Sequence, residues 1–322
     1  MGNRGISANF AAKFEAEGYL AFYQEHKEEL ILGVRNGYVN LYLNCDSISK
    51  VDEKTRVPLT GLINDNLFKP KGRRKKAGKG KEVRISLDEL KRKYKEIKTH
   101  SDGKSDKEAI AHSNLYLHNN RNDSSDWFCF DIEYVQSNTN RRFDILAITR
   151  EKSHSYYRVA VIEVKYGSDA ISGKSSVRKH IKDFYEFYKN KEMNKEEICS
   201  VIHSLRMLGV EVPMSMHSIH PEEISDRVEF YVITINNQQP VNGGSTPKQL
   251  MGGQLFKSVD NKWGAKEFST VLTQEGDFYD LVEHDPNMEV TFLFFDGDVE
   301  SLNIQDIIND ERYDREVFKG KE

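Results

Sequence analysis

The sequence predicts a mixed α/β fold whose central sheet contains both antiparallel and parallel strands. Between residues 105 and 236, segments of helix and strand character follow in the order helix, strand, strand, strand, helix, helix, strand. The first three strands are close enough in sequence to form an antiparallel meander. Two helices separate the third strand from the fourth, and such a crossover allows those two strands to pair in parallel. The chain has 322 residues, which indicates about two structural units.

The composition is polar but globular, with 38% hydrophobic and 30% charged residues. No apolar run reaches the roughly 20 residues of a membrane span, and the N-terminus lacks the apolar stretch of a signal peptide. The three cysteines are widely spaced and form no CxxC pair, which indicates free thiols in a reducing compartment. We therefore expect a cytoplasmic protein with no membrane contact. These cysteines are Cys45, Cys129 and Cys199.

Residues 1–68 predict a small α+β module. Residues 8–30 have helical composition, with Gly18 as the position where the helix is expected to break or kink. The strand-like runs ILGVR, YVNLYLN and SISKV follow, and Asn36-Gly37 joins the first two. Because Asn-Gly between alternating runs is the strongest short hairpin signal, we expect a β-meander with a structural or docking role.

Residues 69–104 predict a basic loop and helix that link this module to the rest of the chain. Residues 69–98 hold 14 Lys or Arg against 4 Asp or Glu, a local net charge of +10 in a chain of net charge −4. Residues 69–82 lack the apolar side chains needed to fold, whereas Ser86 and Glu89 have the spacing of a helix capping box. The segment is either a solvated surface linker or an arm that binds phosphates. On the second interpretation, the nucleic-acid contacts include Arg73, Arg74, Lys75 and Lys76.

Residues 105–322 form the third predicted unit, which contains the mixed sheet. After a helix around KEAIAHSNLYLHNN, its strands are WFCFDIEYVQ, RRFDILAI and RVAVIEVKYG. The helices SSVRKHIKDFYEFYKN and NKEEICSVIHSLRMLG come next, then the strands RVEFYVITI and EVTFLFFDGD and an acidic C-terminal tail. The aromatic run DFYEFY is expected to be a helix face packed on the core.

Charged side chains interrupt the third strand of this sheet. Glu163 and Lys165 are two residues apart, so in a strand they lie on one face, while the aliphatic neighbours Ile162 and Val164 lie on the other. Asp144 lies near the start of the preceding strand. Two carboxylates at one sheet edge suit Mg²⁺, and a lysine beside them can orient water and stabilise charge on a phosphate. The alternative interpretation is that Glu163 and Lys165 lie on the exposed face of an edge strand or form a local ion pair.

RRFDILAI followed by VAVIEVKYG and a helix resembles the PD-(D/E)XK nuclease superfamily, whose fold is the restriction-endonuclease-like core. The resemblance implies that Asp144 and Glu163 bind Mg²⁺ or Mn²⁺, that the Val164 carbonyl is a further metal ligand, and that Lys165 is the catalytic lysine. It covers less than half of the chain. The sequence departs from the name motif in having Phe143 rather than Pro before the aspartate.

Many members of the superfamily carry a further glutamate that reaches the metal. Glu108 is one candidate, because it opens the helix before the first strand of the sheet. Glu133, on that first strand, is the other. The sequence leaves open which of the two completes the site.

The loop GSDAISGK after the third strand opens a basic helix. Gly-rich loops and helix N-termini favour phosphate, so we expect the basic side chains here to hold the nucleic-acid backbone. The loop lacks the spacing of a phosphate-binding P-loop, so no nucleotide cofactor is expected, and the histidines lack the paired spacing of a zinc site. The phosphate-contact candidates are Lys174, Arg178, Lys179 and His180.

These observations together predict a Mg²⁺- or Mn²⁺-dependent nuclease that favours DNA over RNA and belongs to restriction, phage defence or repair. A homodimer would suit double-strand cutting, because antiparallel strands present two-fold related phosphates. The alternative is a catalytically silent nucleic-acid-binding or defence-associated interaction protein that retains the nuclease fold.

Overall fold

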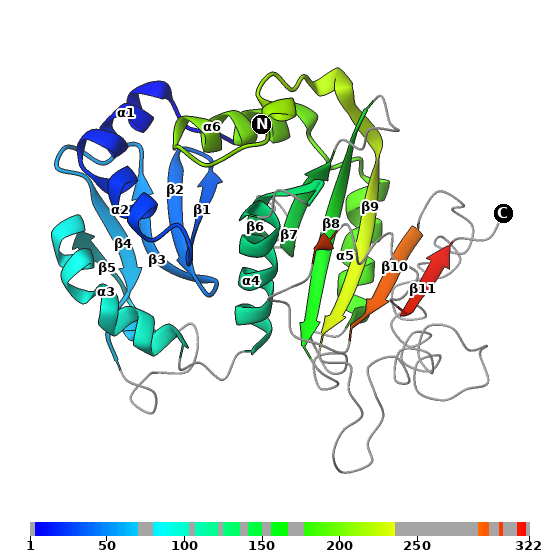
Figure 1. Cartoon of the computed structure of the whole chain (residues 1–322), viewed down its shortest axis with the longest axis horizontal. Helices are drawn as coiled ribbons and strands as arrows, with labels where there is room; N and C mark the ends of the chain where they lie inside the picture. The colour runs from blue at the N-terminus through cyan, green and yellow to red at the C-terminus, as the bar shows by residue number, and fades with distance from the viewer. Residues whose placement is uncertain are drawn as a thin grey trace, which may run out of the picture.

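The structure is a computed structural model that describes residues 4–69, 80–102, 107–121, 125–135, 141–149, 156–166, 177–235, 289–295, 303–304 and 314–319. These residues form helices and two β-sheets, so the predicted mixed α and β class is confirmed (Figure 1). Within the described residues, no helix is long and apolar enough to cross a membrane.

The N-terminal sheet is an antiparallel meander in chain order, and two short helices precede it. The Asn-Gly turn joins its first two strands as predicted, with Gly37 at φ +73°. The predicted helix breaks at Gly18, whose φ of +83° lies in the left-handed region that favours glycine. The elements are α1 (Ala8–Ala16), α2 (Tyr19–Glu25), β1 (Leu30–Arg35), β2 (Tyr38–Leu43), β3 (Asp46–Asp52), β4 (Thr60–Asn64), a 3-10 turn at Asp65–Phe68, and β5 (Glu82–Ser86).

The described part of the predicted linker at 69–104 contains the expected helix and, in addition, a strand of the N-terminal sheet. Strand β5 pairs with β4, and helix α3 (Leu87–Asp102) follows it directly. The backbone N–H of Glu89 donates to the Ser86 hydroxyl at 3.2 Å, which satisfies a helix-start donor as the capping spacing predicted. Helix α3 buries Leu90 and Ile97 against the N-terminal module. Its Lys and Arg side chains therefore belong to an amphipathic helix packed on the module and not to a free linker.

The C-terminal sheet has the order β11-β10-β9-β8-β7-β6. Strands β6, β7 and β8 form the predicted antiparallel meander, and β9 pairs in parallel with β8. Strand β10 continues the sheet in parallel, and the unpredicted β11 closes it antiparallel. Their bounds are β6 (Trp127–Val135), β7 (Arg142–Thr149), β8 (Tyr157–Tyr166), β9 (Ile224–Ile235), β10 (Glu289–Phe294) and β11 (Asp314–Lys319).

Helices cover both faces of this sheet. Helix α4 (Lys107–Arg121) packs Leu115 against the even-numbered face of β8, which carries Ile162 and Val164. The opposite face carries the aromatic run of α5 (Val177–Lys189), whose Phe184 stacks 4.9 Å from the ring of Phe230 on β9. The DFYEFY run is therefore a core face, as predicted. Helix α6 (Lys195–Met207) follows, and 3-10 turns at Met214–Met216 and Pro221–Glu223 lead into β9.

A buried ion cluster joins the two sheets. Asp131 of β6 is completely buried and accepts hydrogen bonds from Arg35 of β1 and from Arg4 near the N-terminus. Arg35 also donates to the Ile132 carbonyl at 2.5 Å. A buried carboxylate needs such compensation, so this cluster fixes β1 beside β6. On the same side of the module, Cys45 of the β2–β3 turn contacts the Ala109 carbonyl of α4.

Candidate active site

The candidate site lies where β7 and β8 separate. The two strands pair as far as Ile145 opposite Ile162, and Asp144 is the next residue of β7. Its side chain replaces the missing strand partner, because Asp144 Oδ2 accepts the backbone N–H of Val164 at 2.9 Å. A carboxylate is thereby fixed beside the C-terminal end of β8.

Glu163 and Lys165 project together from that end of β8, as their spacing predicted. Their side chains form an ion pair, with Lys165 Nζ 2.6 Å from Glu163 Oε1. They are 1% and 3% exposed, which excludes the interpretation as a solvated edge-strand face. Because desolvating an isolated ion pair costs about as much as the attraction returns, further groups are needed to stabilise this one.

Glu108 supplies a further carboxylate from the first turn of α4. Its Oε1 lies 3.2 Å from Lys165 Nζ, and its Oε2 accepts the backbone N–H of Tyr166 at 3.4 Å. Glu133 is directed elsewhere, to Arg142 and to His112. Of the two glutamates that the sequence could not separate, the structure thus brings Glu108 to the Lys165 ammonium.

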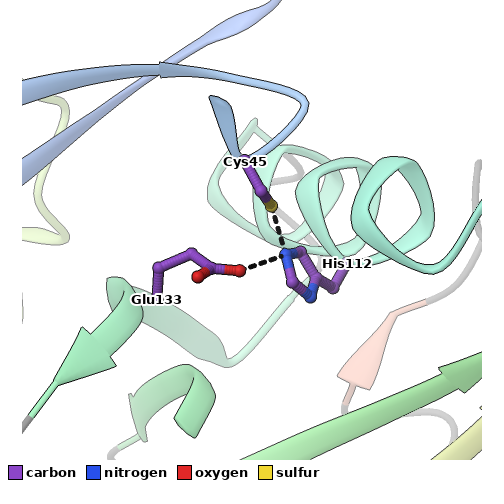
Figure 2. A group of neighbouring side chains, drawn as sticks. All are labelled: Cys45, His112 and Glu133. Atoms are coloured by element: carbon purple, nitrogen blue, oxygen red, sulfur yellow. Dashed lines mark hydrogen bonds and ion pairs between the residues drawn. The ribbon is translucent and has the colours of Figure 1, made fainter. Parts of the chain in front are cut away.

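His112 connects Asp144 to a second group of side chains, although no spacing in the sequence points to it. Its Nδ1 lies 3.6 Å from Asp144 Oδ1, and its Nε2 lies 3.1 Å from Glu133 Oε1. Cys45, from the turn between β2 and β3, also contacts Nε2 (Figure 2). His112 lies one helical turn after Glu108, so the i, i+4 spacing on α4 places both side chains near the open strand ends.

The surroundings push the pKa values of the site carboxylates apart. Burial opposes the charge on Asp144, but the positive charges of His112 and Lys165 outweigh it and hold the pKa of Asp144 well below its usual value. Burial dominates at Glu108 and raises its pKa. Burial alone would lower the pKa of Lys165, but the negative charges around it, above all that of Glu163, raise it, so the ammonium stays protonated at neutral pH.

The basic residues expected to bind phosphate are placed only in part. His180 of α5 lies with Nε2 3.0 Å from Glu163 Oε1, so it contacts the site directly. Arg178 and Lys179 belong to the first turn of α5, but their side chains lie outside the described part of the chain. The other predicted contacts, Arg73, Arg74, Lys75, Lys76 and Lys174, lie outside the described residues.

Several buried atoms of the site have no hydrogen-bond partner among the described residues, and one of them is a carboxylate oxygen. Glu163 Oε2 is buried and makes no hydrogen bond with any described residue, although unpaired buried carboxylate oxygens are costly. The carboxylates of Glu163, Asp144 and Glu108 all lie close enough to Lys165 to raise its pKa, and carboxylate oxygens are the ligands that Mg²⁺ and Mn²⁺ prefer. The donor set therefore fits a divalent cation.

The comparisons with known proteins return nothing: no protein-family model, curated protein or solved structure matches this chain. The geometry of the site is therefore the basis for assigning a function.

Proposed function

We propose that the chain is a Mg²⁺- or Mn²⁺-dependent nuclease that hydrolyses phosphodiester bonds, with DNA as the favoured substrate. The observation that carries this proposal is the convergence of Glu108, Asp144 and Glu163 around Lys165 at the open end of β8. The element order α4, β6, β7, β8, α5, α6, β9 supports a restriction-endonuclease-like core as the finer description of the fold.

Asp144 and Glu163 would hold the metal, together with the backbone carbonyl of Val164 between the strand charges. A divalent cation bound there polarises the scissile phosphate and makes a bound water more acidic. The low pKa of Asp144 keeps its carboxylate ionised, as a metal ligand must be. Oε2 of Glu163, which has no hydrogen-bond partner among the described residues, would supply the second anionic oxygen.

Lys165 and Glu108 are assigned roles other than metal binding. Both have a pKa above the ordinary value, whereas the pKa of the metal ligand Asp144 is lowered. Lys165 stays protonated, so it stabilises the negative charge that develops on the phosphate oxygens and does not act as the base. Glu108 has a raised pKa and a side chain that is one-third exposed, which suits it to accept a proton from an attacking water. His180, beside Glu163, is placed to contact the phosphate.

The experiment is a cleavage assay on single- and double-stranded DNA and RNA, with Mg²⁺, with Mn²⁺ and with EDTA. We expect metal-dependent cleavage that is strongest on DNA. Lys165→Met should slow cleavage by about 10²–10³-fold, the usual effect of removing one group that stabilises charge in the transition state. Asp144→Asn should slow it at least as much, because the amide removes an anionic metal ligand.

Glu229→Gln is the matched control for these substitutions. Glu229 lies on β9 next to β8, and its Oε1 forms an ion pair with Arg158 at 2.6 Å, away from the open strand end. This variant should cleave like the parent. If the chain binds DNA in a salt-dependent way but cleaves none of the four substrates with either metal, the protein is the catalytically silent binding form and the proposal is wrong. Unchanged cleavage by Asp144→Asn would contradict the assigned site.

A further inference from the structure

We propose that Cys45, His112 and Glu133 form a separate zinc-type metal site that links the N-terminal sheet to the C-terminal sheet. The three side chains come from the β2–β3 turn, helix α4 and strand β6, and their ligand atoms lie within 4.8 Å of one another (Figure 2). This site does not depend on the proposed nuclease function, because it shares no ligand with the Asp144–Glu163 pair.

The contacts at one imidazole nitrogen carry the inference. Cys45 Sγ and Glu133 Oε1 both approach Nε2 of His112, the carboxylate oxygen at 3.1 Å. Whether the ring is neutral or protonated, one imidazole nitrogen carries at most one hydrogen or one lone pair, so Nε2 alone satisfies two acidic groups poorly. A cation among the three satisfies all of them, with the imidazole lone pair as one of its ligands.

The donor types select the metal. Thiolate, imidazole and carboxylate are the three side chains that bind Zn²⁺, whereas Mg²⁺ takes oxygen ligands almost exclusively. Cys45 Sγ also lies 3.2 Å from the Ala109 carbonyl, a contact in which the protonated thiol donates. Zinc would displace this proton, because a cysteine binds metal as the thiolate.

The outer contacts are those of a supported metal site. A metal-bound histidine commonly donates its other ring N–H to a carboxylate, and His112 Nδ1 faces Asp144 Oδ1 at 3.6 Å, just beyond hydrogen-bond distance. The second oxygen of Glu133 contacts Arg142, which orients the first toward His112. His112 and Glu133 are 3% and 7% exposed, so these two ligands are shielded from water, and Cys45 is half-buried.

Glu133 has a backbone conformation that is unusual inside a strand. Its φ of +54° lies in the left-handed region that residues other than glycine rarely adopt. Cys45 has φ +62°, but with Asn44 at +47° this is the conformation that the two-residue turn between β2 and β3 requires. The hairpin turn thereby presents the Cys45 thiol to His112.

Cobalt provides the direct test, because Co²⁺ occupies zinc sites and a cobalt–thiolate bond gives a charge-transfer band in the near ultraviolet. We expect the full-length protein, freed of metal with EDTA, to develop this band on titration with Co²⁺ and to lose it when Zn²⁺ is added. Cys45→Ser should lack the band. Cys199→Ser is the matched control, because Cys199 is also a half-buried thiol but lies on α6, outside the cluster, and should keep the band.

Two further variants make the test decisive. Glu133→Gln keeps the shape of the side chain and should weaken Co²⁺ binding by about 10-fold or more, the loss that even a supporting residue causes. Glu163→Gln should leave the band unchanged, so failure of the nuclease proposal would not be confused with failure of this one. Absence of a thiolate band in the parent, or an equal band in a folded Cys45→Ser, would overturn the inference. So would Glu133→Gln binding Co²⁺ as tightly as the parent, a result that does not depend on the folding of the cysteine variant.

Discussion

Replacing Lys165 by Met should destabilise the protein and make its stability depend on Mg²⁺. The ammonium is 3% exposed and lies 2.6 Å from a Glu163 oxygen and 3.2 Å from a Glu108 oxygen. Removing one partner of a buried ion pair costs about 3–5 kcal/mol, because the remaining charge is left uncompensated. Methionine keeps an unbranched apolar chain of similar length, so little of that cost should come from a cavity.

The dependence on Mg²⁺ follows from the charges left behind. Without the ammonium, the carboxylates of Glu108, Asp144 and Glu163 have no shared cation, so a divalent cation should bind more tightly to the variant than to the parent. A ligand at 100 times its dissociation constant stabilises the folded state by about 2.7 kcal/mol. Saturating Mg²⁺ should therefore return a large part of the missing stability to Lys165→Met.

Urea unfolding in EDTA and in Mg²⁺, followed by far-ultraviolet circular dichroism and tryptophan fluorescence, measures both effects. Trp127 is buried on β6, so its fluorescence reports on the sheet that carries the site. Glu229→Gln serves again as the control and should show no Mg²⁺-dependent gain beyond that of the parent. An unchanged urea midpoint for Lys165→Met in EDTA, or equal Mg²⁺ shifts for variant and parent, would refute the reasoning.

Three further predictions concern the buried ion cluster between the sheets, the stability at acid pH, and the basic residues 73–76. Asp131→Asn should lower the free energy of unfolding by about 3–5 kcal/mol in urea melts, because Arg35 is left buried without its counter-charge. The folded-state pKa of Asp144 lies below its ordinary value of 3.8, so its ionisation stabilises the fold above that pH and this gain is lost as the pH falls through the folded-state pKa. The stability difference between the parent and Asp144→Asn in pH-dependent urea melts should therefore shrink below about pH 4. Changing residues 73–76 to alanine should weaken DNA binding and reduce the slope of log affinity against log salt by about 0.9 for each phosphate that the variant no longer neutralises; an unchanged slope would show that these residues do not bind phosphate.

Local periodicity accounts for the parts of the site that the sequence predicted. The period of two along β8 was enough to place Glu163 and Lys165 together, since aliphatic residues at Ile162 and Val164 fix which face the charges occupy. The parallel pairing of β8 with β9 was also predictable, because a helical crossover separates them, whereas β11 was not predicted.

Contacts between distant segments account for the parts that were missed. Cys45 and His112 are 67 residues apart and belong to different layers, so no spacing rule connects them. Tertiary contact, which the sequence pattern does not carry, brings them together. Strand β5 was missed for a different reason: its Val83 and Ile85 alternate with polar residues as in a strand, but the segment has only five residues and lies inside the basic run.

Two buried carboxylates of the same sheet show why the strand end should be functional rather than structural. Asp131 is completely buried, and both of its oxygens accept hydrogen bonds, Oδ1 from Arg35 and Ile132 and Oδ2 from Arg4. Glu163 is 1% exposed, yet its Oε2 has no partner among the described residues. A carboxylate that only stabilises the fold should resemble Asp131, because each unsatisfied buried oxygen costs free energy. Asp131→Asn should therefore impair folding and leave metal binding by the folded protein unchanged. Glu163→Gln also breaks the pair with Lys165 and should cost stability, but in addition its folded fraction should lose metal binding and cleavage. Measuring both properties for both variants separates the two roles.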